Sequence, residues 1–169
     1  MKIIRSNSQA HSTANRQIGF TLVEVMVALL VMAVGMLGIA ALYIESLRSG
    51  HMAVSYTTAV TLVADMADRI RANANANVAY GGAAVGNAVA GADNSCVNAI
   101  GENVTCSAVQ LAADDWFWWY ESIKVRMPVG RSATIAVVNN PPVNVYTITL
   151  SWPERGQAAP VQYAMTFSK

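Results

Sequence analysis

One stretch of this sequence constrains the whole fold. From Val25 to Ile44 the chain reads VMVALLVMAVGMLGIAALYI, twenty residues without a charge. As an α-helix with a rise of about 1.5 Å per residue, this stretch would span about 30 Å, the thickness of the hydrocarbon layer of a bilayer. It therefore predicts a membrane-spanning helix. A carboxylate, Glu24, stands at its start. Because an ionisable side chain among lipids is costly unless it is paired, Glu24 is a candidate functional residue.

The segment before this run, residues 1–19, carries three basic residues and no acidic residue. Positive charge beside a membrane helix holds that end in the cytoplasm, which predicts that the rest of the chain is exported. An ordinary secretory signal, cut near Ala40–Ala41, is an alternative. It is less favoured because its apolar core would be unusually long and would contain Glu24.

Helical spacing continues beyond the apolar run. Leu62, Met66 and Ile70 recur at intervals of four residues. This pattern predicts one helix from about residue 21 to about residue 73, apolar all round in its first half and amphipathic in its second. Gly35 and Gly38 are places where this helix could loosen. We therefore expect three parts: a leader over 1–19, a membrane or filament-core helix over 20–45, and an exported globular domain over 46–169.

The segment 73–106 is rich in alanine, glycine and asparagine, and we expect a flexible loop there. Its cysteines, Cys96 and Cys106, are expected to form a disulfide, because an exported domain lies in an oxidising compartment. Two free thiols are an alternative, and a metal site that also uses His51 is a weaker one. No Gly-Lys-Ser/Thr follows the glycines of this loop, so a phosphate-binding loop is not expected.

A second helix is predicted from Ser107 to about Met127. Ser107 and Gln110 have the spacing of a capping box, and a proline follows the last turn. Three tryptophans and a tyrosine within this helix allow two interpretations. In the first, the rings fill the gap between the long helix and a sheet. In the second, they form a surface that docks a neighbouring subunit or a sugar; the residues concerned are Trp116, Trp118, Trp119 and Tyr120.

Three strands are expected at about 132–138, 145–152 and 161–167, separated by segments that contain proline and asparagine. The middle strand alternates between apolar and polar residues, as a strand with one buried face does. The fold class is therefore α+β: a long N-terminal helix packed on an antiparallel sheet of about three to four strands, with a second helix.

Charge and chemistry exclude several functions. Beyond residue 46 the chain carries 8 basic and 8 acidic residues, so the clustered positive charge that nucleic-acid binding needs is missing. Asp114 and Asp115 are adjacent, so on a helix they diverge by about 100° and cannot share a proton. A Ca²⁺ site at Asp93 would have one nearby carboxylate, too few for the ion. We expect no enzyme activity, no metal and no cofactor.

The residues around Glu24 also carry a resemblance. Gly19, followed by Phe20-Thr-Leu-Val-Glu24 at the start of an apolar helix, resembles the class III signal of type IV pilins and of type II secretion pseudopilins. The resemblance implies that a prepilin peptidase cuts between Gly19 and Phe20 and methylates the new amine of Phe20. It also implies that Glu24 pairs with the Phe20 amine of an adjacent subunit, which sets the register of the packed helices.

Three further segments are similar to the PilV family of type IV pilus modification proteins, which are minor pilins. They are DMADRIRAN (65–73), the second helix leading into MPVG (127–130), and TITLSWPERG (147–156). This family implies a pilin-like fold and a role in starting the filament, near its tip, in support of adhesion and twitching. The implied partners are the peptidase, other minor pilins and the major pilin, first in the inner membrane and then in the extracellular pilus. A minor pseudopilin, a tip adhesin or DNA-uptake pilin that uses the Trp116–Tyr120 surface, and a membrane-anchored enzyme are the alternatives.

Overall fold

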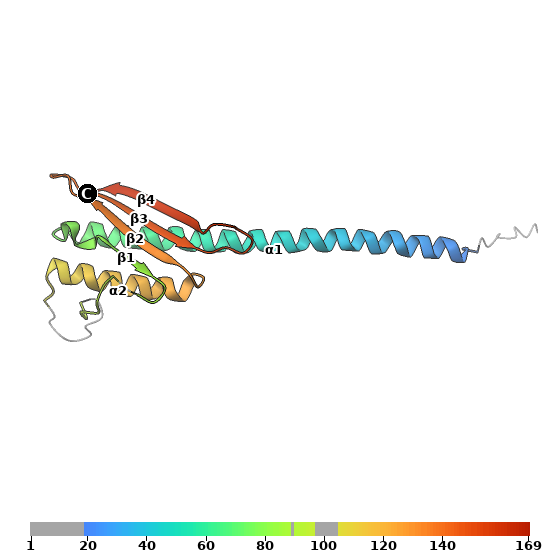
Figure 1. The fold of residues 1–169 in the computed structure, drawn as a ribbon, viewed down its shortest axis with the longest axis horizontal. Helices are drawn as coiled ribbons and strands as arrows, with labels where there is room; N and C mark the ends of the chain where they lie inside the picture. Colours follow the sequence, from blue (N-terminus) through green and yellow to red (C-terminus); the bar gives the residue numbers. More distant parts are fainter. Residues whose placement is uncertain (1–18, 89, 97–104) are drawn as a thin grey trace, which may run out of the picture. The chain divides into compact units, whose positions relative to one another are not determined.

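The computed structural model describes residues 19–88, 90–96 and 105–169. It divides into two compact units, residues 1–44 and residues 45–169. Helix α1, Leu22–Ala72, contributes to both, and each unit is considered by itself (Figure 1). The leader, with the exception of Gly19, lies outside the described residues. The predicted helix from about 21 to 73 is confirmed.

The described part of the first unit is an apolar helix with no covered face. None of its side chains is buried; Leu22 is 77% exposed and Leu42 74%. By length and composition, helix α1 can cross a membrane. An apolar surface on every side is stable only when lipid or other helices cover it.

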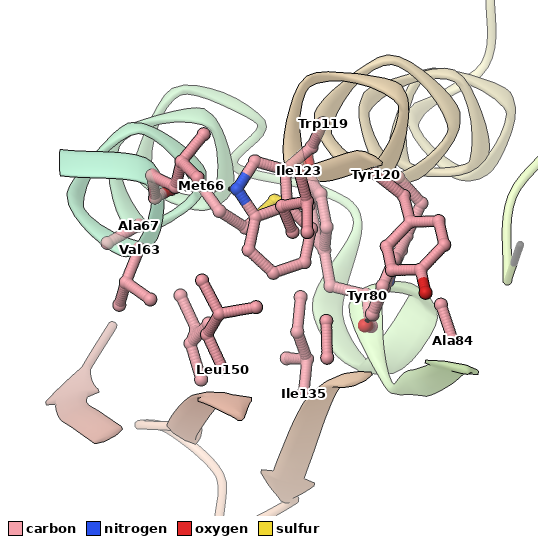
Figure 2. Close-up of a cluster of buried hydrophobic side chains, with 14 of the residues drawn as sticks. Val63, Met66, Ala67, Tyr80, Ala84, Trp119, Tyr120, Ile123, Ile135 and Leu150 are labelled. Atoms are coloured by element: carbon pink, nitrogen blue, oxygen red, sulfur yellow. Dashed lines mark hydrogen bonds between the residues drawn. The ribbon is translucent and has the colours of Figure 1, made fainter. Parts of the chain in front are cut away.

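The second unit packs two helices against one antiparallel sheet. The strands follow the order β1-β2-β3-β4, so every strand pairs with its neighbour in sequence. Core side chains from both helices point toward the sheet (Figure 2). This arrangement confirms the predicted α+β fold. The elements that follow α1 are η1 (Asn77–Tyr80), β1 (Gly82–Val85), α2 (Ala108–Arg126), β2 (Ser132–Val138), β3 (Val145–Trp152) and β4 (Val161–Ser168).

Local signals explain where α2 begins. The Ser107 side chain accepts a hydrogen bond from the Gln110 backbone N–H, and the Gln110 side chain accepts one from the Ser107 N–H, 2.9 Å away. Both bonds of the predicted capping box are therefore present, which satisfies two of the donors that a helix start leaves free. The helix ends before Pro128, as expected.

The described part of the segment 73–106 contains two short elements that were not predicted from the sequence. Within it, η1 and the short strand β1 precede the disulfide between Cys96 and Cys106, whose Cα atoms lie 6.0 Å apart. The disulfide confirms the pairing of the cysteines. Strand β1 was missed because its sequence, GAAV, has almost no β-forming residues. It is held by its pairing with β2, from Gly82↔Ile135 to Val85↔Ser132.

The core follows the two periodicities of the sequence. Along β3 every second side chain is at most 1% exposed, whereas α1 buries a stripe at helical spacing. The stripe supplies one wall, β3 the other, and aromatic side chains of α2 fill the space between them (Figure 2). The residues buried from α1 are Ala59, Leu62, Val63, Met66, Ala67 and Ile70.

Residues 90–96 lie against α2. The Ala92 N–H donates to the Ala113 carbonyl oxygen at 3.1 Å, and the Asn94 N–H donates to an Asp114 carboxylate oxygen at 2.7 Å. Gly91 allows this close approach. A Cβ atom there would lie 2.1 Å from the Ala113 oxygen and 2.7 Å from the Phe117 nitrogen.

We predict that Gly91→Ala lowers the free energy of unfolding of the second unit by about 1–3 kcal/mol, because the added methyl group would push residues 90–96 off α2. The measurement is urea unfolding of the detergent-extracted full chain, followed by tryptophan fluorescence. All four tryptophans lie in the second unit, so the signal reports on that unit.

Gly50→Ala is the matched control for this prediction. A Cβ atom at Gly50 meets nothing within 4 Å, and alanine favours a helix by up to about 1 kcal/mol over glycine. This change should leave stability equal or higher. Equal stability of Gly91→Ala and the wild type would contradict the close packing of residues 90–96 on α2.

Candidate functional site

The first turn of α1 is capped by Thr21. Its hydroxyl accepts a hydrogen bond from the Glu24 backbone N–H at 3.3 Å, and its carbonyl accepts one from the Val25 N–H at 3.3 Å. Thr21 and Glu24 therefore have the Thr-x-x-Glu spacing of a capping box, a signal that the sequence analysis overlooked. Because the helix begins at Leu22, the Gly19–Phe20 peptide bond lies outside it.

Glu24 and Phe20 lie together at this end of α1. Phe20 is 82% exposed, and both residues line a shallow apolar groove with Val25, Ala28 and Met32. Glu24 also stands in the first helical turn, where the helix dipole favours a negative charge. Its carboxylate forms no ion pair within the described part of the chain. The structure thus presents an available anion on an otherwise apolar surface.

The aromatic residues of α2 do not form the docking surface that was considered. Trp116 is 2% exposed, and Trp119 and Tyr120 are 0% exposed. The docking hypothesis is therefore wrong for these three residues, and the other interpretation, in which rings fill the gap between α1 and the sheet, is confirmed (Figure 2). Trp118 is partly buried and contacts Phe117 edge-to-face, with ring centroids 5.3 Å apart.

The buried indoles also fix α2 to its neighbours. The Trp119 N–H donates to the Leu62 carbonyl oxygen of α1 at 2.7 Å, and the Trp116 N–H donates to the Tyr80 carbonyl oxygen at 2.7 Å. A buried indole is stable only when its N–H finds an acceptor. Each ring therefore contributes apolar area and one directional bond, so these tryptophans have a structural role.

Asp114 and Asp115 diverge, as adjacent helical residues must. Asp115 accepts from the Tyr80 hydroxyl at 2.6 Å and from Arg69 at 3.1 Å, whereas Asp114 accepts from the Asn94 backbone. The Asn73 amide group donates to the Tyr80 oxygen at 3.2 Å. This buried network joins the end of α1, η1 and α2. The sequence does not predict this network, because no local spacing connects residues so far apart.

The pKa values of two groups in this network, Tyr80 and Arg69, are raised. Burial raises the pKa of Tyr80 above its ordinary value, and the hydrogen bond to Asp115 raises it further. Burial lowers the pKa of Arg69, but its contacts with Asp65 and Asp115 outweigh burial and raise it overall. Both groups therefore keep their protons at neutral pH. Among the described residues no three metal-ligating side chains gather in one place.

Two protein-family models match this chain, and one of them covers the start of α1. Residues 14–40 match the model of the prokaryotic N-terminal methylation motif. Residues 41–117 match the Tt1218-like model, described as type IV pilin Tt1218. Searches of curated proteins and of solved structures find no significant match. The chain thus carries an N-terminal segment similar to the N-methylation motif of prepilins and a following segment similar to type IV pilin Tt1218.

The Tyr80–Asp115 bond predicts a pH dependence. A raised pKa means that the neutral phenol stabilises the fold fully below pH 10, the ordinary pKa of tyrosine. Above that pH, unfolded chains release the proton while folded chains keep it, so this stabilisation declines. We expect Tyr80→Phe to be less stable than the wild type by about 1–3 kcal/mol at pH 8.

The difference between the two chains should shrink above pH 10 by up to about 1.4 kcal/mol per pH unit. Urea unfolding of the detergent-extracted chains, followed by tryptophan fluorescence between pH 8 and pH 11, provides the test. Parallel curves over this range would contradict a Tyr80 that is held neutral by burial and by Asp115.

Proposed function

We propose that this chain is a minor pilin that helps to initiate type IV pilus assembly and is incorporated at or near the filament tip, in support of adhesion and twitching. The observation that carries the proposal is the start of α1. There an exposed carboxylate, Glu24, lies on an uncovered apolar helix, five residues after Gly19. A surface of this kind requires other helices or lipid around it.

The proposed processing follows from the same segment. The prepilin peptidase cuts the Gly19–Phe20 bond and transfers a methyl group to the Phe20 amine. The methylated amine is a cation, and Glu24 is the anion that pairs with it across two subunits. A buried ion pair of this type contributes specificity more than stability, because desolvation offsets much of its attraction. The pair therefore sets the register of the helices.

The membrane topology and the partners are part of the proposal. The basic leader, residues 1–19, favours a cytoplasmic N-terminus and a periplasmic second unit. The chain then moves from the inner membrane into the extracellular pilus, with the major pilin and other minor pilins as neighbours. The resemblance of residues 65–73 and 147–156 to the PilV family favours a minor over a major pilin. The balanced charge of the exported part favours no nucleic-acid partner.

A minor pseudopilin of a type II secretion system is the second candidate, because such proteins begin with the same signal. The tip-adhesin candidate loses its support, since its proposed surface is buried around Trp116, Trp119 and Tyr120. Type IV pilins are structural proteins rather than enzymes as a class.

We predict that Glu24→Ala reduces the amount of this chain in sheared surface pili at least about 10-fold, because the amine of a neighbouring Phe20 would be left unpaired among apolar helices. Cleavage should still occur, since the scissile bond is intact. The measurement is immunoblotting of sheared pili against membranes, with the chain's mass recorded in both fractions.

Glu45→Ala is the matched control. Glu45 is also an exposed carboxylate of α1, but it already pairs with Arg48 at 3.9 Å. This variant should enter pili as the wild type does. Normal incorporation of Glu24→Ala would contradict the role of Glu24. Absence of the wild-type chain from pili, together with a secretion defect when it is deleted, would favour the pseudopilin.

A further inference from the structure

The sheet has two edges of different character. β1 forms one edge and is four residues long, and its last residue, Val85, makes a bridge with Ala88. β4 forms the other edge and has eight residues. Figure 1 shows β4 as the outermost strand of the sheet. A strand at an edge presents unpaired N–H and C=O groups along its outer side.

The hydrogen bonds beside β4 show which groups are unpaired. Asn144 and Lys169 exchange both backbone bonds at 2.9 Å, so they form a hydrogen-bonded pair of the antiparallel ladder. Such pairs recur at every second residue. The odd-numbered residues of β4 therefore bond to β3, and the even-numbered ones direct their backbone groups away from it. In the described part of the chain these four have no backbone partner: Gln162, Ala164, Thr166 and Ser168.

This edge lacks the features that usually protect one. β4 contains no proline and no charged residue. It has no bulge, because each of its residues pairs one-to-one with β3, from Val145↔Ser168 to Trp152↔Val161. Its even-numbered side chains are exposed. Natural sheets block open edges by charge, proline, bulges or a covering segment. β4 therefore remains able to accept another strand.

The inner face of β4 is incompletely covered. Its inward side chains are partly exposed, whereas those of β3 are at most 1% exposed. Beside the start of β4 lies an apolar groove, lined by Met52, Tyr56, Trp152 and Val161 among others. Tyr56 is 47% exposed and contacts Tyr163 edge-to-face, with ring centroids 5.6 Å apart. An added strand would place alternate side chains over this groove and beside the inward side chains of β4.

We propose that the β4 edge is a docking site for an extended, uncharged segment of another protein chain, which adds antiparallel to β4 with apolar side chains at alternate positions. The backbone groups specify the occupant, because a strand satisfies four N–H and four C=O groups in one row and a helix does not. The antiparallel direction continues the sheet and gives the more stable ladder. This inference goes beyond the assembly role proposed above and does not depend on the Glu24 pairing.

The first test is backbone hydrogen exchange of the wild-type full chain in detergent, resolved by residue. The amides of residues 163, 165 and 167 bond to β3 and should exchange at least about 100-fold more slowly than those of Gln162, Ala164 and Thr166. This alternation needs no substitution. Equal protection along β4 would show that the edge is already covered and would overturn the proposal.

The second test adds a probe strand. The probe is a synthetic peptide with the β3 sequence VYTITLSW, flanked by lysines for solubility, because β3 already pairs antiparallel with β4. Saturating peptide should slow exchange at Gln162, Ala164 and Thr166 by at least about 10-fold. The same peptide with proline in place of its isoleucine should not. Failure of the first peptide to protect these amides would overturn the proposal.

Ala164→Pro and Ala164→Thr separate edge binding from other contacts. Proline at position 164 removes an outward N–H and leaves the bonds to β3 intact, whereas threonine keeps that N–H. The proline variant should lose peptide protection and the threonine variant should retain it. Equal protection in both would overturn the proposal. If Ala164→Pro fails to fold, Thr166→Pro gives the same comparison.

Discussion

The constraint on which the rest of this account depends is an uncovered apolar helix with a carboxylate, Glu24, at its start. Within the described part of the first unit no side chain of α1 is buried, so lipid or neighbouring helices must cover this apolar surface. Glu24 then requires a cation in the same apolar environment. In the proposed filament, that cation is the methylated Phe20 amine of a neighbouring subunit. The processing and the assembly that we propose both follow from this single constraint.

The second unit holds its half of α1 through one buried stripe of side chains and through bonds to backbone carbonyl groups. One stripe of α1 is buried in the core, and its backbone carbonyls accept further bonds. The Trp119 indole donates to the Leu62 oxygen at 2.7 Å, and the Lys169 ammonium group donates to the Asn73 oxygen at 2.7 Å. At the far side of the sheet, no element pairs with the outer edge of β4 among the described residues. The unit thus holds its half of α1 in the core, and β4 is the edge that we propose as a docking site.

Periodicity made most of the fold predictable. The four-residue spacing of Leu62, Met66 and Ile70, the capping box at Ser107 and the alternation along β3 gave the helices and three strands. β1 depends on pairing with β2 rather than on its own sequence, so it was missed. The Tyr80–Asp115 bond joins residues 35 apart, which no local pattern encodes. The hypothesis of an aromatic docking surface was wrong for Trp116, Trp119 and Tyr120, because a sequence shows which residues share a helix face but not what covers that face.

The most direct test of this account is the intact mass and N-terminal sequence of the membrane-extracted wild-type chain, with and without the prepilin peptidase. The account predicts a chain that starts at N-methyl-Phe20 when the peptidase is present and an uncut leader when it is absent. A chain that starts after Ala40, or that is identical in both strains, would contradict it. Glu24 would then have no methylated amine to pair with, and the apolar half of α1 would be a signal or an anchor.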